Sequence, residues 1–260
     1  MPIATFHSPA VFYQTNGTGL PVVFLHGFCE DHRVWEPFYN SFKDCQMIYI
    51  DVPGFGHSTR AAVPDLGHMA DVVVLLLEKL NIEKCILIGH SMGGYIGLAF
   101  AEKYSHMLMG LGLVHSSPFA DDKKKKAQRL KEKKFISKYG SEKYIAELIP
   151  KLFTKKYAFS KITKQLIERA QQYAHVGIQD GLVAMMNRPD RSNILKNIDC
   201  PVLIIAGEED GVIPMEKSLA FSAFPKVCSM HFLPKVAHMG MFEATAKCRK
   251  IMDDFITYCR

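Results

Sequence analysis

The chain has 260 residues, of which 48% are hydrophobic and 22% are charged, and its formal net charge at pH 7 is +6. This is ordinary for a globular protein, with length for one domain carrying an insertion or for two small domains. No apolar run reaches the roughly 20 residues that span a bilayer. The N-terminus lacks the basic and apolar regions of a signal peptide. If Met1 is the native start, we expect a cytoplasmic protein without a membrane span.

The positive charge is concentrated in one segment. Residues 118–190 hold 17 Lys and Arg against 8 Asp and Glu, and the rest of the chain holds 15 against 18. The run Lys123 to Lys126 could form a nucleic-acid or membrane patch, but it has little aromatic interleaving. A solvated helix face without a nucleic-acid partner is the better interpretation, and attraction of anionic substrates is a lesser alternative.

The seven cysteines are scattered, and none belongs to a C-x-x-C motif. This pattern favours reduced, mostly buried thiols over disulfides or a zinc site. We expect no metal and no organic cofactor in this protein.

Three strands are expected before residue 60. The first, Ala10–Thr15, is predicted to be an antiparallel edge strand, whereas Val22–Leu25 and Met47–Ile50 are near-continuous apolar runs typical of a parallel sheet. His-Gly-Phe follows at 26–28. The segment Asp51 to Ser58 could suggest a phosphate or metal loop, but no G-x-G-x-x-G helix follows it, so we predict a tight turn.

A sharp turn between strand and helix is the most informative feature. After a helix predicted at Leu66–Leu80, the strand Cys85–Ile88 leads into Gly-His-Ser-Met-Gly-Gly at 89–94, and a helix is expected over Gly93–Ala101. Strand, G-x-S-x-G turn and helix form the setting in which a serine acts as a nucleophile. Ser91 is the candidate; the alternative is a glycine-rich turn with an exposed serine.

The alternation of strands and helices stops after the strand predicted at Leu111–Val114. Helical spacing without strands continues to Arg191, in residues 144–152 and 166–174. We therefore predict a core formed by residues 1–117 and 192–260, with a helical insertion at 118–191.

The strand predicted at Val202–Ala206 is followed by three acidic residues. A serine nucleophile needs a base and a third group that orients the base, and in this type of fold they follow in the order Ser, acid, His. Asp210 is favoured for its place in a turn between Gly211 and Pro214, while Glu208 and Glu209 remain chemical rivals.

The last strand, predicted at Met230–Leu233, leads to His238 and then to a helix at Thr245–Tyr258. Its position after the final strand makes His238 the candidate base among eleven histidines. The backbone N–H groups of Phe28 and Met92 are the expected donors to an oxyanion. His26 could compete as a base, but a structural role in this loop is favoured.

With these motifs in order, the chain resembles the α/β-hydrolase superfamily over nearly its whole length. The resemblance implies a mostly parallel sheet flanked by helices, with residues 118–191 as a helical cap. A serine at position 91, where dehalogenases and epoxide hydrolases of this fold carry aspartate, implies the serine branch. Residues 186–192 are similar to a segment of bacterial carboxylesterases and enol-lactonase-like members.

The resemblance implies a hydrolase acting on a small or medium ester or lactone through Ser91, His238 and Asp210, as a monomer or homodimer. C–C bond hydrolase or enol-lactonase activity on the same triad is the main alternative. A cofactor-free perhydrolase and a non-catalytic small-molecule receptor remain further alternatives.

Overall fold

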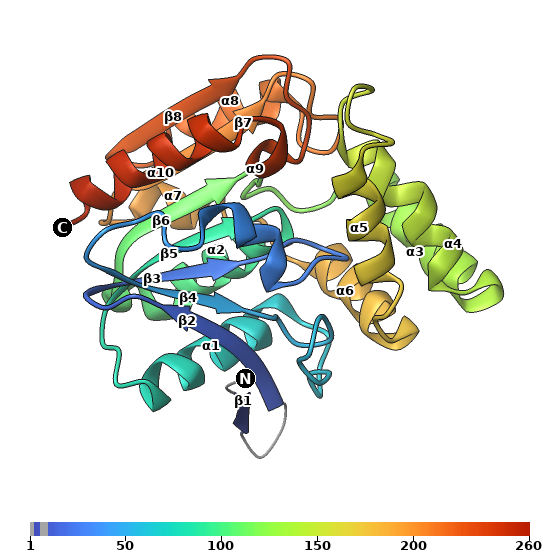
Figure 1. The fold of residues 1–260 in the computed structure, drawn as a ribbon, viewed down its shortest axis with the longest axis horizontal. Helices are drawn as coiled ribbons and strands as arrows, with labels where there is room; N and C mark the ends of the chain where they lie inside the picture. Colours follow the sequence, from blue (N-terminus) through green and yellow to red (C-terminus); the bar gives the residue numbers. More distant parts are fainter. Residues whose placement is uncertain (1–2, 6–9) are drawn as a thin grey trace.

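A computed structural model describes residues 3–5 and 10–260 and shows an eight-stranded sheet with helices on both faces (Figure 1). The strand order is β1-β2-β4-β3-β5-β6-β7-β8. The strands are β1 (Ile3–Thr5), β2 (Ala10–Asn16), β3 (Leu20–Leu25), β4 (Cys45–Ile50), β5 (Cys85–His90), β6 (Leu108–Val114), β7 (Val202–Gly207) and β8 (Cys228–Leu233). All neighbours from β4 to β8 pair in parallel, which confirms the predicted α/β class.

Helices occupy the connections between these strands. The α-helices are α1 (Leu66–Lys79), α2 (Met92–Tyr104), α3 (Lys123–Tyr139), α4 (Ser141–Leu148), α5 (Lys161–Ala170), α6 (His175–Asn187), α7 (Ser192–Asn197), α8 (Met215–Ser222), α9 (Gly240–Glu243) and α10 (Thr245–Tyr258). Short 3₁₀ helices are η1 (His32–Phe38), η2 (Ser105–Met107) and η3 (Ile149–Leu152). None of the helices in the described ranges is both long and apolar enough to cross a membrane.

The N-terminal strands differ from the expectation in one respect. β2 is antiparallel to β4, as predicted, but it is not the edge of the sheet, because β1 pairs with its other side. The register places Ile3 opposite Phe12. A three-residue strand is too short to show the alternation by which strands are recognised in a sequence.

Small residues let helices pack closely on both faces of the sheet. A side chain at Gly97 of α2 would meet Leu87 and Leu111, and one at Gly110 of β6 would meet Phe255 of α10. Because adjacent strand residues point to opposite faces, Leu111 and Gly110 place α2 and α10 on opposite sides of β6. The helices therefore lie close against both faces of the sheet.

Helices α3 to α6 lie between β6 and β7 in the chain and gather beyond one end of the sheet (Figure 1). Within residues 115–201 the structure contains helices and turns but no strand, as the sequence predicted. The helical run expected at 166–174 is shorter in the structure, where α5 ends at Ala170. The division at residues 118 and 191 into core and insertion stays a prediction.

Candidate active site

The carboxyl ends of three parallel strands bring the predicted side chains together. Ser91 follows β5, Asp210 follows β7 and His238 follows β8. His238 Nε2 lies 2.9 Å from Ser91 Oγ, and His238 Nδ1 lies 2.8 Å from Asp210 Oδ2. The rivals Glu208 and Glu209 are exposed, whereas Asp210 is buried.

The turn at Ser91 has a backbone conformation that few residues adopt. Its φ of 49° and ψ of −112° lie outside the ordinary regions, and such strain persists only where the surroundings hold it. The Ser91 N–H donates to Val114 O at 2.9 Å, and Ser91 O accepts from Ser116 Oγ at 2.8 Å. A side chain at Gly93 would lie 2.3 Å from Leu25 O, so glycine alone fits there.

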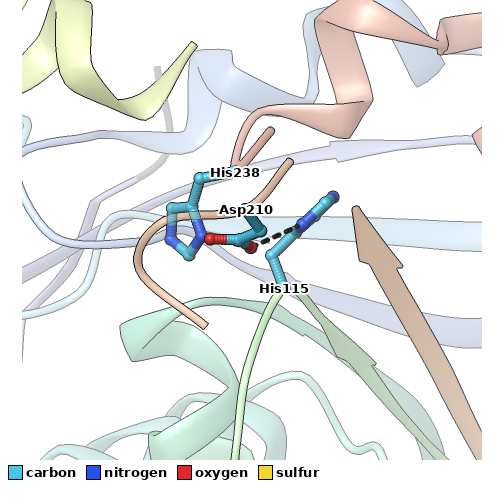
Figure 2. A group of neighbouring side chains, drawn as sticks. All are labelled: His115, Asp210 and His238. Atoms are coloured by element: carbon cyan, nitrogen blue, oxygen red, sulfur yellow. Dashed lines mark hydrogen bonds and ion pairs between the residues drawn. The ribbon is translucent and has the colours of Figure 1, made fainter. Parts of the chain in front are cut away.

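Asp210 is held as a carboxylate by four donors. Its Oδ1 accepts from the N–H groups of Val212 and Ile213, and its Oδ2 lies between His238 and His115 (Figure 2). Burial alone would raise the pKa of Asp210. The attraction of His238 and the hydrogen bonds of both histidines outweigh burial and hold that pKa well below its usual range. Asp210 therefore carries a negative charge at neutral pH.

His115, which the sequence analysis did not single out, completes this cluster. It lies directly after β6, is fully buried, and its Nδ1 is 3.0 Å from Asp210 Oδ2. Burial lowers the pKa of His115 to about 4 although the bond to Asp210 opposes this. A neutral ring that donates from Nδ1 fits both facts. A histidine placed directly after a buried strand was the signal available in the sequence.

A second buried pair, His90 and Glu30, contacts the backbone of His238. The sequence analysis did not single out this pair either. His90 Nδ1 is 2.9 Å from Glu30 Oε2, and His90 Nε2 is 3.0 Å from the carbonyl oxygen of His238. Burial opposes charge on His90, but the neighbouring Glu30 carboxylate more than offsets this and raises the pKa of His90. Glu30 also accepts from the Gly27 N–H at 2.6 Å. The pair thus joins the loop at 26–28 to the loop of His238.

The His238 loop is also fixed from the helical insertion. The His238 N–H donates to Leu152 O at 2.9 Å. Glu243 accepts from the Ala237 N–H on one oxygen and from the N–H and hydroxyl of Thr154 on the other. These bonds make the position of His238 depend on the segment after η3.

The loop after β3 lies beside Ser91. His26 has the expected structural role, because its Nε2 accepts from the Val52 N–H at 3.0 Å. The N–H groups of Phe28 and Met92 donate to no other group among residues 3–5 and 10–260. A cavity of about 90 Å³ is lined by Phe28, Ser91 and His238. The Ser91 hydroxyl and the His238 imidazole therefore meet at one small cavity, and the assignment of the Phe28 and Met92 N–H groups as oxyanion donors stays a prediction.

Among residues 3–5 and 10–260, two groups of side chains have donor atoms close enough for a metal ion. One is His115, Asp210 and His238, and the other is Asp31, His32 and Asp51. In the first group both histidine Nδ1 atoms are hydrogen-bonded to the same carboxylate oxygen. The geometry of this group is therefore that of a proton-transfer chain.

The chain was compared with known proteins. The model of the family described as "Serine aminopeptidase, S33" matches residues 20–245. A "2-succinyl-6-hydroxy-2,4-cyclohexadiene-1-carboxylate synthase" of Salmonella arizonae is 31% identical over 206 residues, covering 74% of this chain and 79% of that relative.

Solved structures have the same fold. A thermophilic esterase from Thermogutta terrifontis, described as malate bound, superposes with a TM-score of 0.90 at 25% identity, over 96% of this chain and 94% of the esterase. The enol-lactonase from Burkholderia xenovorans superposes with a TM-score of 0.91 at 19% identity, over 98% of this chain and all of that protein. The chain therefore belongs to the serine aminopeptidase S33 family and is an α/β-hydrolase.

Proposed function

We propose that this hydrolase cleaves small or medium carboxylic esters or lactones through an acyl-enzyme on Ser91. One observation carries the proposal. An unbroken hydrogen-bonded chain leads from Ser91 Oγ through the ring of His238 to the buried Asp210 carboxylate. Such a chain activates a hydroxyl that is a poor nucleophile by itself.

The first half of the reaction forms the acyl-enzyme. His238 Nε2 takes the Ser91 proton as Oγ bonds to the carbonyl carbon. The N–H groups of Phe28 and Met92 bind the oxyanion, and each such donor contributes about 3 kcal/mol to lowering the barrier. The carbon–oxygen bond to the alcohol then breaks, and the protonated His238 gives its proton to the departing oxygen.

The second half releases the acid. A water molecule loses a proton to His238 and attacks the acyl carbon, and Ser91 Oγ leaves with that proton. Throughout, Asp210 keeps the Nδ1–H tautomer of His238 and stabilises its positive charge. We assign His115 to positioning Asp210, because it donates to the same carboxylate oxygen.

The cavity favours a small acyl group. Its volume of about 90 Å³ holds only a few heavy atoms beside Ser91. Leu148, Leu152 and Met185 line it from the segment between β6 and β7. We therefore propose that residues 118–191 act as the cap that limits what reaches the serine.

The main alternative uses the same residues on another bond. C–C bond cleavage or enol-lactone opening needs the same nucleophile, base and oxyanion donors. The similarity to the Burkholderia enol-lactonase and to the Salmonella synthase supports these reactions as alternatives. A panel of esters, lactones and vinylogous diketones separates them by relative kcat/KM. A perhydrolase would require hydrogen peroxide in that assay, and a non-catalytic receptor would turn over none of the substrates.

The decisive experiment is replacement of the nucleophile. We expect Ser91→Ala to lower kcat for p-nitrophenyl acetate by about 10⁴-fold or more while the circular dichroism spectrum is retained. Ser218→Ala is the matched control, because Ser218 is buried in α8 and its hydroxyl has no partner among the described residues. Normal turnover by Ser91→Ala, or failure of a fluorophosphonate to label Ser91, contradicts the proposal.

The compartment and the assembly state belong to the same proposal. All seven cysteines are free thiols. Free thiols fit a reducing compartment such as the cytoplasm. A monomer or homodimer stays a prediction, which light scattering of the purified protein tests.

A further inference from the structure

The small cavity at Ser91 adjoins a larger one. The second cavity has a volume of about 390 Å³ and shares four lining residues with the first, namely Tyr95, Lys125, Arg129 and Val212. A volume of this size accommodates most of a small substrate. The bulk of a substrate whose acyl group lies at Ser91 therefore fits in this second cavity.

Positive side chains dominate the lining of the larger cavity. Its cationic residues are Lys124, Lys125, Arg129, Lys131, Arg188 and Lys217, and its carboxylates are Asp121 and Asp122. Both carboxylates are already engaged. Asp121 pairs with two arginines, Arg129 and Arg188, and Asp122 accepts from the Lys125 N–H at the start of α3. A surplus of positive charge is left facing the cavity.

The terminal nitrogens of Arg129 can donate further hydrogen bonds. Its side chain is buried, with 7% of the residue exposed, and it lines both cavities. Among the described residues its ionic partner is Asp121, which it contacts through Nε. The terminal nitrogens of the guanidinium therefore keep donors that an arginine in so buried a place usually commits to a carboxylate.

Lys125 lies one helical turn before Arg129 and on the same face of α3. It lines both cavities, and its amine has no ion pair among the described residues. Burial and the nearby Arg129 charge lower the pKa of Lys125. Two cations at this spacing repel each other, so an anion between them would relieve an unfavourable interaction.

One carboxylate of α3 does reach the Ser91 cavity, that of Glu132. Its oxygens accept from Gln128 Nε2 at 3.1 Å and from the Tyr144 hydroxyl at 3.3 Å. These bonds direct Glu132 toward α4 and its own helix. It does not pair with Lys125 or Arg129.

We propose that Lys125 and Arg129 form a subsite for a carboxylate carried by the substrate. The inference rests on the proposed hydrolase function and names its substrate class: esters or lactones whose alcohol portion bears a carboxylate. An arginine with free terminal nitrogens matches the two oxygens of a carboxylate, and a lysine adds a point charge. Ser91 would then act on the carbonyl while the anion anchors the remainder of the molecule.

The test compares two acetyl esters of equal size, 4-acetoxybenzoate and its neutral analogue 4-acetoxybenzamide. We expect kcat/KM to favour the carboxylate by about 10-fold, as for one partly exposed charge-assisted contact. Lys125→Gln should remove most of that preference. Lys126→Gln removes the same charge from the next residue, which lines neither cavity, and should keep the preference.

A binding measurement separates failure of the subsite from failure of the proposed function. In the Ser91→Ala protein, calorimetry should show 4-acetoxybenzoate binding several-fold more tightly than the amide, and Lys125→Gln should abolish the difference. Equal binding of the two compounds, or an equal loss with Lys126→Gln, overturns the subsite. If Ser91→Ala binds 4-acetoxybenzoate selectively but the wild-type protein does not hydrolyse it selectively, the hydrolase proposal is overturned instead.

Discussion

Two histidines flank His238, and their pKa values shift in opposite directions although burial lowers both. His90 is paired with the Glu30 carboxylate, so its pKa is raised. His115 faces an Asp210 carboxylate that is already shared with His238, so burial dominates and its pKa falls to about 4. The Glu30 carboxylate thus favours the protonated form of His90, whereas His115 contributes a neutral donor.

The lowered pKa of His115 predicts an acid-labile fold. On unfolding its pKa returns to the ordinary histidine value of 6.5. Between pH 6.5 and 4 the unfolded chain therefore binds more protons than the folded one, and the free energy of unfolding falls as the pH falls. From pH 7 to 4.5 we expect a loss of about 2 kcal/mol from this residue. Urea unfolding at both pH values should show that loss in the wild type and not in His115→Asn, which can still donate to Asp210.

One other histidine acts in the same direction, because burial lowers the pKa of His231 as well, but His231 is present in both proteins and its contribution cancels in the comparison. The lowered pKa of Asp210 contributes stability that is present above about pH 4 and lost below it, outside the window. The raised pKa of His90 stabilises the fold at low pH, the opposite direction. Equal pH dependence in the wild type and His115→Asn would contradict the assignment of a neutral His115.

At the scale of elements, the turn between β5 and α2 depends on close backbone approach. Gly93 lies against Leu25 of β3, and the same turn fixes Ser91 at positive φ. Local sequence made this turn predictable, because an apolar strand, small residues and a helix follow one another without a gap. The strain is held by hydrogen bonds to Val114 and Ser116, which lie in or after another strand.

We predict that Gly93→Ala destabilises the protein by more than 3 kcal/mol, or prevents folding. The new methyl group would lie 2.3 Å from a backbone oxygen, which cannot rotate away. Gly211→Ala is the matched control, because a methyl group there meets nothing within 4 Å. Thermal unfolding midpoints measure both variants, and similar midpoints for the two would refute the packing argument.

Long apolar elements were predictable, and short ones were not. Seven strands and the helices α1, α2 and α10 were predicted near their observed bounds, because apolar residues recur along each of them. The short helices α7 and α8 were missed, since six or eight residues give little periodic signal and their stability comes from packing. β1 was not predicted either, because three residues show no alternation.

At the scale of the whole molecule, polar contacts join the helices between β6 and β7 to the loops that follow β3 and β4. The Tyr173 hydroxyl donates to Asp31 Oδ2 at 2.5 Å in a buried setting, and an exposed ion pair joins Arg60 to Asp180. The buried bond matters more, because solvent screens the exposed pair. Since η3 also holds the His238 loop through Leu152, motion of the helices between β6 and β7 would reach His238, the proposed base.

We therefore predict that Tyr173→Phe loosens the insertion. A lost hydrogen bond to a buried carboxylate costs about 1–3 kcal/mol. Hydrogen exchange should quicken in α5 and α6, and kcat for a neutral ester should fall as His238 loses its fixed position. Tyr157→Phe is the control, since the Tyr157 hydroxyl has no hydrogen-bond partner among the described residues. Unchanged exchange in Tyr173→Phe would disprove this coupling.

The sequence by itself determined the α/β class, the Ser91 turn and the order serine, acid, histidine, because apolar runs and turn residues act locally. Tertiary structure decided what depends on distance and desolvation. It selected Asp210 over two neighbouring glutamates, brought His115 and His90 to the site, and placed Lys125 and Arg129 over the cavity. Spacing along a chain does not specify which side chains of separate elements meet, nor how far water is excluded from them.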